Sequence, residues 1–175
     1  MIKNFLKCFK ADLCLGILIF VVLCIIAIIN PTETVGAWIN ELIMANWISK
    51  LIGVWFLLAL VSPLMKSSMS INFVTKYLGT LLLGAATAAL AANFFVFIIT
   101  NIRVMLDTNT RQIFGFINFC ITGTNLLQIL FITISIMLSK YSLTQEWKTK
   151  KKLFFIMLAI FIFLLHLCFF GLCQK

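Results

Sequence analysis

Five long runs of apolar residues, separated by shorter polar segments, dominate the pattern along this chain. The runs extend over residues 11–29, 48–65, 77–99, 113–138 and 153–173. A helix needs about 20 mostly apolar residues to cross about 30 Å of hydrocarbon, because its backbone polar groups must pair within the segment. The pattern therefore predicts an all-α integral membrane protein, a polytopic bundle of transmembrane helices with five spans.

The second run is the weakest of the five. It carries Lys50 near its start and Pro63 near its end, which shortens its uninterrupted apolar stretch. The segment before it places several large apolar side chains near one helical face: Trp38, Ile39, Leu42, Ile43 and Trp47. That spacing is typical of a short helix in the outer membrane interface, or of an outward extension of the second span. Four spans plus an interfacial or re-entrant helix are the alternative to five crossings.

Composition supports the membrane interpretation without depending on any one run. Hydrophobic residues make up 63% of the 175 and charged residues only 11%, against about 45–50% and about 25% in soluble domains. No Gly/Ser-rich or Pro-rich linker and no repeat divides the sequence. We therefore expect residues 1–175 to form a single transmembrane domain.

The formal charge of +9 would suggest a nucleic-acid partner in a soluble protein, but here the basic residues lie between apolar runs. If the N-terminus and alternate segments are cytoplasmic, ten of the 14 Lys and Arg residues fall inside. This pattern predicts an N-in, C-out topology in a membrane such as the bacterial inner membrane, with no direct nucleic-acid contact. The first run is followed by no small-residue cleavage site, so we expect it to remain as a span.

The third run contains the best packing signal. Gly84, Ala88 and Ala92 recur at four-residue spacing on one helical face. Small residues at this spacing let helix backbones approach closely in lipid. We call these three residues the packing seam, and it fits either packing within the chain or a contact between protomers of a homo-oligomer.

The fourth run is the most polar. Asn118, Thr122 and Asn125 share one of its faces, and unpaired amides facing lipid would cost several kcal/mol each. In the predicted topology Asn93, Asn118, Thr122 and His166 lie about 7 to 14 Å below the outer surface. They are candidates for one polar cluster, in which His166 is either a functional ionisable group or a neutral hydrogen-bonding contact between helices.

Before the fifth run lies a basic segment that contains Lys148, Lys150, Lys151 and Lys152. Such a juxtamembrane cluster attracts anionic lipid at about 1 kcal/mol per charge or docks an acidic cytosolic partner. Its simplest role is to set the topology.

Other chemistry is not expected. The six cysteines include no CxxC pair, and the sequence predicts no metal site and no cofactor. GxSxG, HExxH and P-loop motifs are missing, and Asp12, Asp107 and Glu146 are too scattered for an acid/base pair. With no carboxylate in the last four runs, ion-coupled transport and enzymatic activity are both disfavoured.

Three classes of function fit these features. The first is a non-catalytic sensor, scaffold or protection protein of the bacterial inner membrane, of the immunity, entry-exclusion or phage-defence type, an analogy only. It would act through helix packing and a basic cytoplasmic face that docks a partner. The alternatives are a channel or small-solute carrier whose path is lined by the fourth span, and an accessory subunit of a larger membrane complex.

Overall fold

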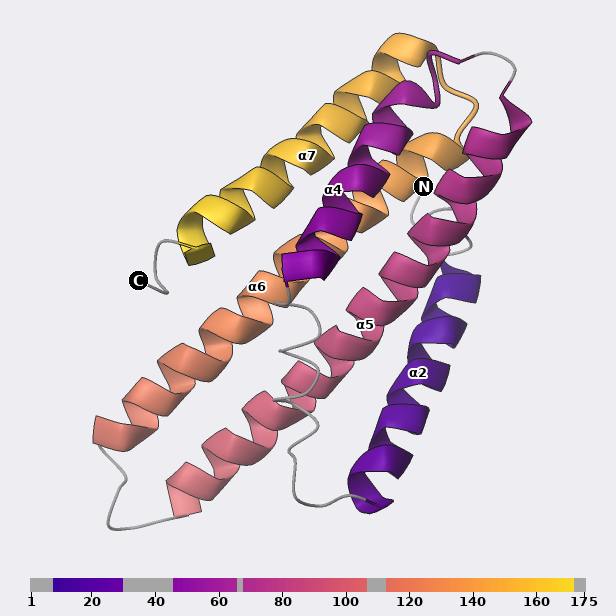
Figure 1. Cartoon of the computed structure of the whole chain (residues 1–175). Coiled ribbons are helices and arrows are strands. Elements are labelled where there is room, and N and C mark those ends of the chain that lie inside the picture. The colour runs from indigo at the N-terminus through magenta and orange to yellow at the C-terminus, as the bar shows by residue number, and fades with distance from the viewer. Residues whose placement is uncertain (1–7, 30–45, 66–67, 107–112, 172–175) are drawn as a thin grey trace.

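The structure, a computed structural model, describes residues 8–29, 46–65, 68–106 and 113–171, and these ranges contain helices and no strand. The helices are α2 (Lys10–Ile29), α4 (Asn46–Val61), α5 (Met69–Leu106), α6 (Ile113–Thr144) and α7 (Thr149–Gly171) (Figure 1). The predicted all-α class is thereby confirmed. Most of the predicted interfacial helix, residues 35–45, lies outside the described residues, and its last residue, Trp47, lies in the first turn of α4.

Among the described residues, three helical segments are long and apolar enough to cross a membrane: Met69–Leu106, Gly115–Thr144 and Thr149–Phe169. They fit the predicted membrane protein. The helix of the second run is shorter, and its apolar part covers Ile48–Val61. The number of crossings and the orientation stay predictions.

Helices α5 and α6 extend well beyond the apolar runs that predicted them. Helix α5 begins at Met69 instead of residue 77, and α6 ends at Thr144 instead of residue 138. Polar residues can continue a helix because helical hydrogen bonds join backbone N–H and C=O groups and do not require an apolar side chain. In the added part of α5, the Thr75 hydroxyl donates to the Ile71 oxygen of the same helix. The extended parts of these helices contain charged residues that the apolar runs leave out, among them Lys76 of α5 and Lys140 of α6.

Helices α5 and α6 pack along each other and form the centre of the bundle (Figure 1). Helix α2 packs on α5, α7 packs on α6, and α4 contacts α5, α6 and α7. The outward faces remain apolar, with Ile17 of α2, Leu57 of α4 and Phe154 of α7 all more than half exposed. That surface suits contact with lipid tails.

Trp55 of α4 anchors the contact between α4 and α5. Its side chain is fully buried, and its indole Nε1 donates a hydrogen bond to the Thr75 oxygen at 2.9 Å. Gly79 leaves the room for the ring, because a Cβ atom there would lie 2.9 Å from the indole. The short helix α4 is thus fixed to the bundle by one aromatic side chain seated on a glycine.

Glycines also bring α2 and α5 close together. A Cβ atom on Gly16 would lie 2.1 Å from Thr87 Oγ1 and 3.1 Å from the backbone oxygen of Gly84. A Cβ atom on Gly84 would in turn lie 2.8 Å from the side chain of Leu15. Close backbone approach of this kind increases van der Waals contact between helices in lipid.

Candidate functional site

Positive charge is concentrated at one end of the bundle. Helices α5 and α7 begin there and α4 and α6 end there, and we call it the basic end. Of the nine Lys and Arg residues in the described ranges, all but Lys50 and Arg103 lie at this end: Lys10, Lys76, Lys140, Lys148, Lys150, Lys151 and Lys152. The basic end is therefore the candidate functional site.

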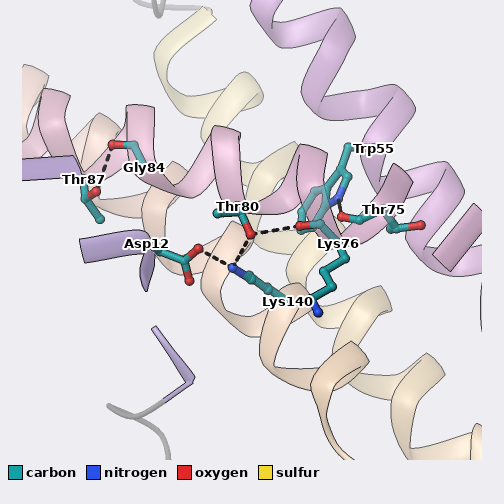
Figure 2. Close-up of polar contacts among 8 residues, drawn as sticks. All are labelled: Asp12, Trp55, Thr75, Lys76, Thr80, Gly84, Thr87 and Lys140. Carbon is teal, nitrogen blue, oxygen red and sulfur yellow. Dashed lines mark hydrogen bonds and ion pairs between the residues drawn. The ribbon is translucent and has the colours of Figure 1, made fainter. Parts of the chain in front are cut away.

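A buried ion pair links the first and fourth described helices at the basic end. Asp12 of α2 is 0% exposed and Lys140 of α6 is 8% exposed, and the Lys140 ammonium donates to Asp12 Oδ1. Lys140 Nζ also donates to Thr80 Oγ1 of α5 at 2.9 Å, so the three side chains join three helices (Figure 2). Thr80 in turn donates to the Lys76 oxygen.

The sequence did not reveal this pair. Asp12 and Lys140 are 128 residues apart, and Lys140 lies beyond the end of the fourth apolar run, 113–138. Asp12 was grouped with carboxylates too scattered to act together. One signal was available: a lone carboxylate inside an otherwise apolar run needs a partner, and a lysine at the same end of another span is the natural choice.

Next to the ion pair, the basic end is hollowed by a cavity of about 540 Å³. Its lining comes from α5, α6, the first turn of α7 and the segment that follows α4: Ser62, Pro63, Met65, Asn72, Thr75, Lys76, Lys140, Leu143, Thr144 and Lys152. A volume of this size is typical of small-molecule sites. We call it the basic cavity.

Beside the cavity, the predicted lysine segment is held in place by aromatic contacts. The Trp147 ring lies 5.5 Å from the Tyr141 ring and 4.9 Å from the Phe155 ring, between centroids. Lys151 Nζ lies 4.4 Å from the Trp147 ring centroid, which is a cation–π geometry. The lysines differ in their surroundings: Lys148, Lys150 and Lys151 are exposed, whereas Lys152 is half-buried and lines the cavity.

The residues of the predicted polar cluster lie on three helices. Asn93 is buried on α5 and donates to the Ala89 oxygen at 3.0 Å, within its own helix. On α6, Thr122 Oγ1 donates to the Asn118 oxygen at 2.7 Å and accepts from Asn101 of α5 at 3.4 Å.

The remaining two members lie on different helices. Asn125 of α6 is half-buried, and His166 is buried on α7, with its ring 6.3 Å from that of Phe163. Asn101 is a member that sequence reasoning missed, because we had placed it beyond the end of the third span. Helices α5 and α7 pack on α6 and not on each other. A single cluster therefore stays a prediction.

The packing seam is buried within the chain. Gly84 contacts Leu15 of α2, and Ala88 and Ala92 are 1% and 3% exposed. Ala88 also borders an apolar cavity of about 220 Å³ between α2, α4, α5 and α6. The seam thus has partners in this chain, and a homo-oligomer stays a prediction that this surface does not support.

Comparisons of the chain with protein-family models, with curated proteins and with solved structures found no match.

Proposed function

We propose that this chain is a non-catalytic membrane sensor or scaffold whose basic end docks an acidic cytosolic partner protein. The observation that carries the proposal is the exposed lysine cluster at the start of α7. Lys148, Lys150 and Lys151 project there from a segment that the packed ring of Trp147 holds in place. A fixed array of like charges presents a preformed surface, which lowers the ordering cost of binding.

The position of these lysines in the helix strengthens the argument. Lys150, Lys151 and Lys152 lie in the first turn of α7, where the helix dipole adds partial positive charge. Cations at a helix N-terminus are unfavourable by themselves, whereas an anion docked there gains from both the dipole and the lysines. A carboxylate-rich partner surface would supply that anion, and electrostatic complementarity would speed its association.

The orientation that this proposal needs has the basic end in the cytoplasm, with the N-terminus inside and the C-terminus outside. Basic residues flanking membrane spans are enriched on the cytoplasmic side, and seven of the nine described ones lie at the basic end. We include five crossings of a bacterial inner membrane in the proposal. Thiol labelling from either side of the membrane, of single cysteines placed at residues 148 and 103, tests this orientation.

Affinity purification from native membranes in a mild uncharged detergent tests the docking role. The test variant combines Lys148→Gln, Lys150→Gln and Lys151→Gln, and leaves the cavity-lining Lys152 in place. The control variant combines Lys50→Gln and Arg103→Gln, which remove charge from outside the basic end. We expect a soluble acidic partner to copurify in stoichiometric amount with wild type and control and to be lost from the test variant.

Other outcomes of the same experiment contradict the proposal. Retention of the soluble partner by the triple variant would show that these lysines do not dock it. A stoichiometric integral membrane partner in place of a soluble one would instead identify the chain as an accessory subunit of a membrane complex.

A further inference from the structure

The basic cavity combines charge and hydrogen-bonding groups that the docking proposal does not use. Lys76, Lys140 and Lys152 line it, and the carboxylate of Asp12, which pairs with Lys140, balances one of the three charges. Hydroxyl and amide groups of Ser62, Asn72, Thr75 and Thr144 complete its polar lining. An occupant with one or two negative charges and several acceptor oxygens would match this set.

The walls of the cavity are fixed by hydrogen bonds between the elements that form it. Ser62, just after α4, donates to Asn72 Oδ1 in the first turn of α5. Ser142 Oγ of α6 donates to the backbone oxygen of Lys152 in α7 at 3.0 Å. These contacts hold Asn72 and Lys152 at the cavity without engaging the Lys152 ammonium, so the site is preformed for a ligand.

Two helix N-termini add to the positive potential of the cavity. Asn72 lies in the first turn of α5 and Lys152 in the first turn of α7, and both residues line the cavity. The backbone N–H groups of Asn72 and Lys152 donate to the oxygens of Ser68 and Lys148, so the contribution of these helix ends is the helix dipole, which favours an anion near a helix N-terminus. The lysines and both helix ends therefore favour the same kind of occupant.

The rim of the cavity indicates which source of phosphate fits. Pro63, Met65 and Leu143 give the lining an apolar part. Met65 is 46% exposed, and its neighbour Leu64 is 60% exposed. A ligand with acyl chains can place its phosphate among the lysines and its chains along this apolar rim, which a soluble phosphate compound cannot do.

We propose that the basic cavity binds the phosphate headgroup of an anionic phospholipid, with Lys76 and Lys152 as its charge partners. Basic pockets between transmembrane helices near the cytoplasmic surface are established sites for such headgroups. The inference rests on the membrane placement in the proposed function and not on the protein partner. The lipid acts as a bound component that joins the ends of α4, α5, α6 and α7.

The test measures lipid binding to the full chain in an uncharged detergent by native mass spectrometry. The probes are phosphatidylglycerol and phosphatidylcholine with identical acyl chains, and glycerol 3-phosphate serves as the soluble phosphate. The test variant is Lys76→Gln/Lys152→Gln. The matched control is Lys148→Gln/Lys150→Gln, which removes the same charge from the same end outside the cavity. We expect the test variant to lose about thirtyfold in affinity for phosphatidylglycerol and the control less than about threefold.

Phosphatidylcholine binding should be weak and equal in all three proteins, and glycerol 3-phosphate should not displace phosphatidylglycerol at equal concentration. Equal loss of phosphatidylglycerol from both variants would overturn the proposal, because it would show binding to the general field of the basic end. Displacement by glycerol 3-phosphate would overturn the lipid assignment in favour of a soluble anion. If the double variant does not fold by circular dichroism, Lys152→Gln alone should lose about fivefold, and an unchanged affinity there would also overturn it.

The two proposals fail separately. The control variant removes two of the three lysines assigned to protein docking, so a protein that loses its partner but keeps phosphatidylglycerol supports the cavity. If Lys76→Gln/Lys152→Gln loses phosphatidylglycerol but retains the protein partner, the result supports a docking surface separate from the cavity.

Discussion

Breaking the Asp12–Lys140 pair from either side should destabilise the protein by unequal amounts. Two unit charges about 4 Å apart attract by about 4 kcal/mol at an effective dielectric constant of about 20, and desolvation offsets much of this gain. Removing only one partner is different, because it leaves a buried charge uncompensated and typically costs about 3–5 kcal/mol. Removing one partner should therefore lower the free energy of unfolding by more than the intact pair contributes to it.

Lys140→Met should be the more damaging of the two single substitutions, at about 3–5 kcal/mol. It leaves the carboxylate of Asp12 fully buried, and no other described residue donates to its Oδ2 atom. Asp12→Asn should cost less, about 2–3 kcal/mol, since Lys140 keeps its bond to Thr80 and lines the basic cavity into which its ammonium can move. The double variant should be more stable than the sum of the two losses implies, with a coupling above about 1 kcal/mol.

Unfolding of the purified protein in mixed micelles, titrated with a denaturing detergent and followed by circular dichroism, measures these differences. Lys148→Met is the matched control, because Lys148 is exposed, and it should stay within about 0.5 kcal/mol of wild type. Additive losses in the double variant, or a Lys140→Met variant as stable as the control, would refute the reasoning.

Two further predictions concern helix contacts and use the same unfolding assay. Gly16→Val should destabilise by about 1–3 kcal/mol, because its side chain meets Thr87, whereas Gly53→Val, which has open space around its Cβ position, should not; equal losses would contradict the close α2–α5 contact. Trp55→Phe should cost about 1–3 kcal/mol through the lost hydrogen bond to Thr75 and the smaller ring, and an unchanged stability would show that α4 is not anchored by the indole.

Helix positions could be predicted from the sequence better than helix ends. The first run, 11–29, corresponds to α2 (Lys10–Ile29) within one residue at its start. The apolar run marks only the part of a helix that lipid must cover, so it could not show that α5 continues from Met69 to Leu106. Backbone hydrogen bonds extend the helix into polar sequence, because they do not require an apolar side chain. The ends of α5 and α6 were missed for that reason.

The candidate site, too, could be predicted from the sequence only in part. The lysines at the start of α7 could be recognised from composition alone, because positive charge next to an apolar run is a local pattern. The basic cavity could not be recognised in this way, because Asn72, Lys76 and Thr144 lie between the apolar runs. Only the packing of α4, α5, α6 and α7 brings them together. Pairings across the bundle, such as Asp12 with Lys140, depend on helix order in space, which the sequence pattern does not specify.

The ion pair between α2 and α6 also constrains how the chain is made. Asp12 emerges from the ribosome 128 residues before Lys140, which at about 5–20 residues per second is a delay of about 6 to 26 s. Throughout that interval the first helix carries a carboxylate without its final partner, so α2 gains its full hold on the bundle only after α6 has been synthesised. Truncation before Lys140 should therefore leave α2 packed on α5 with the buried carboxylate of Asp12 unpaired.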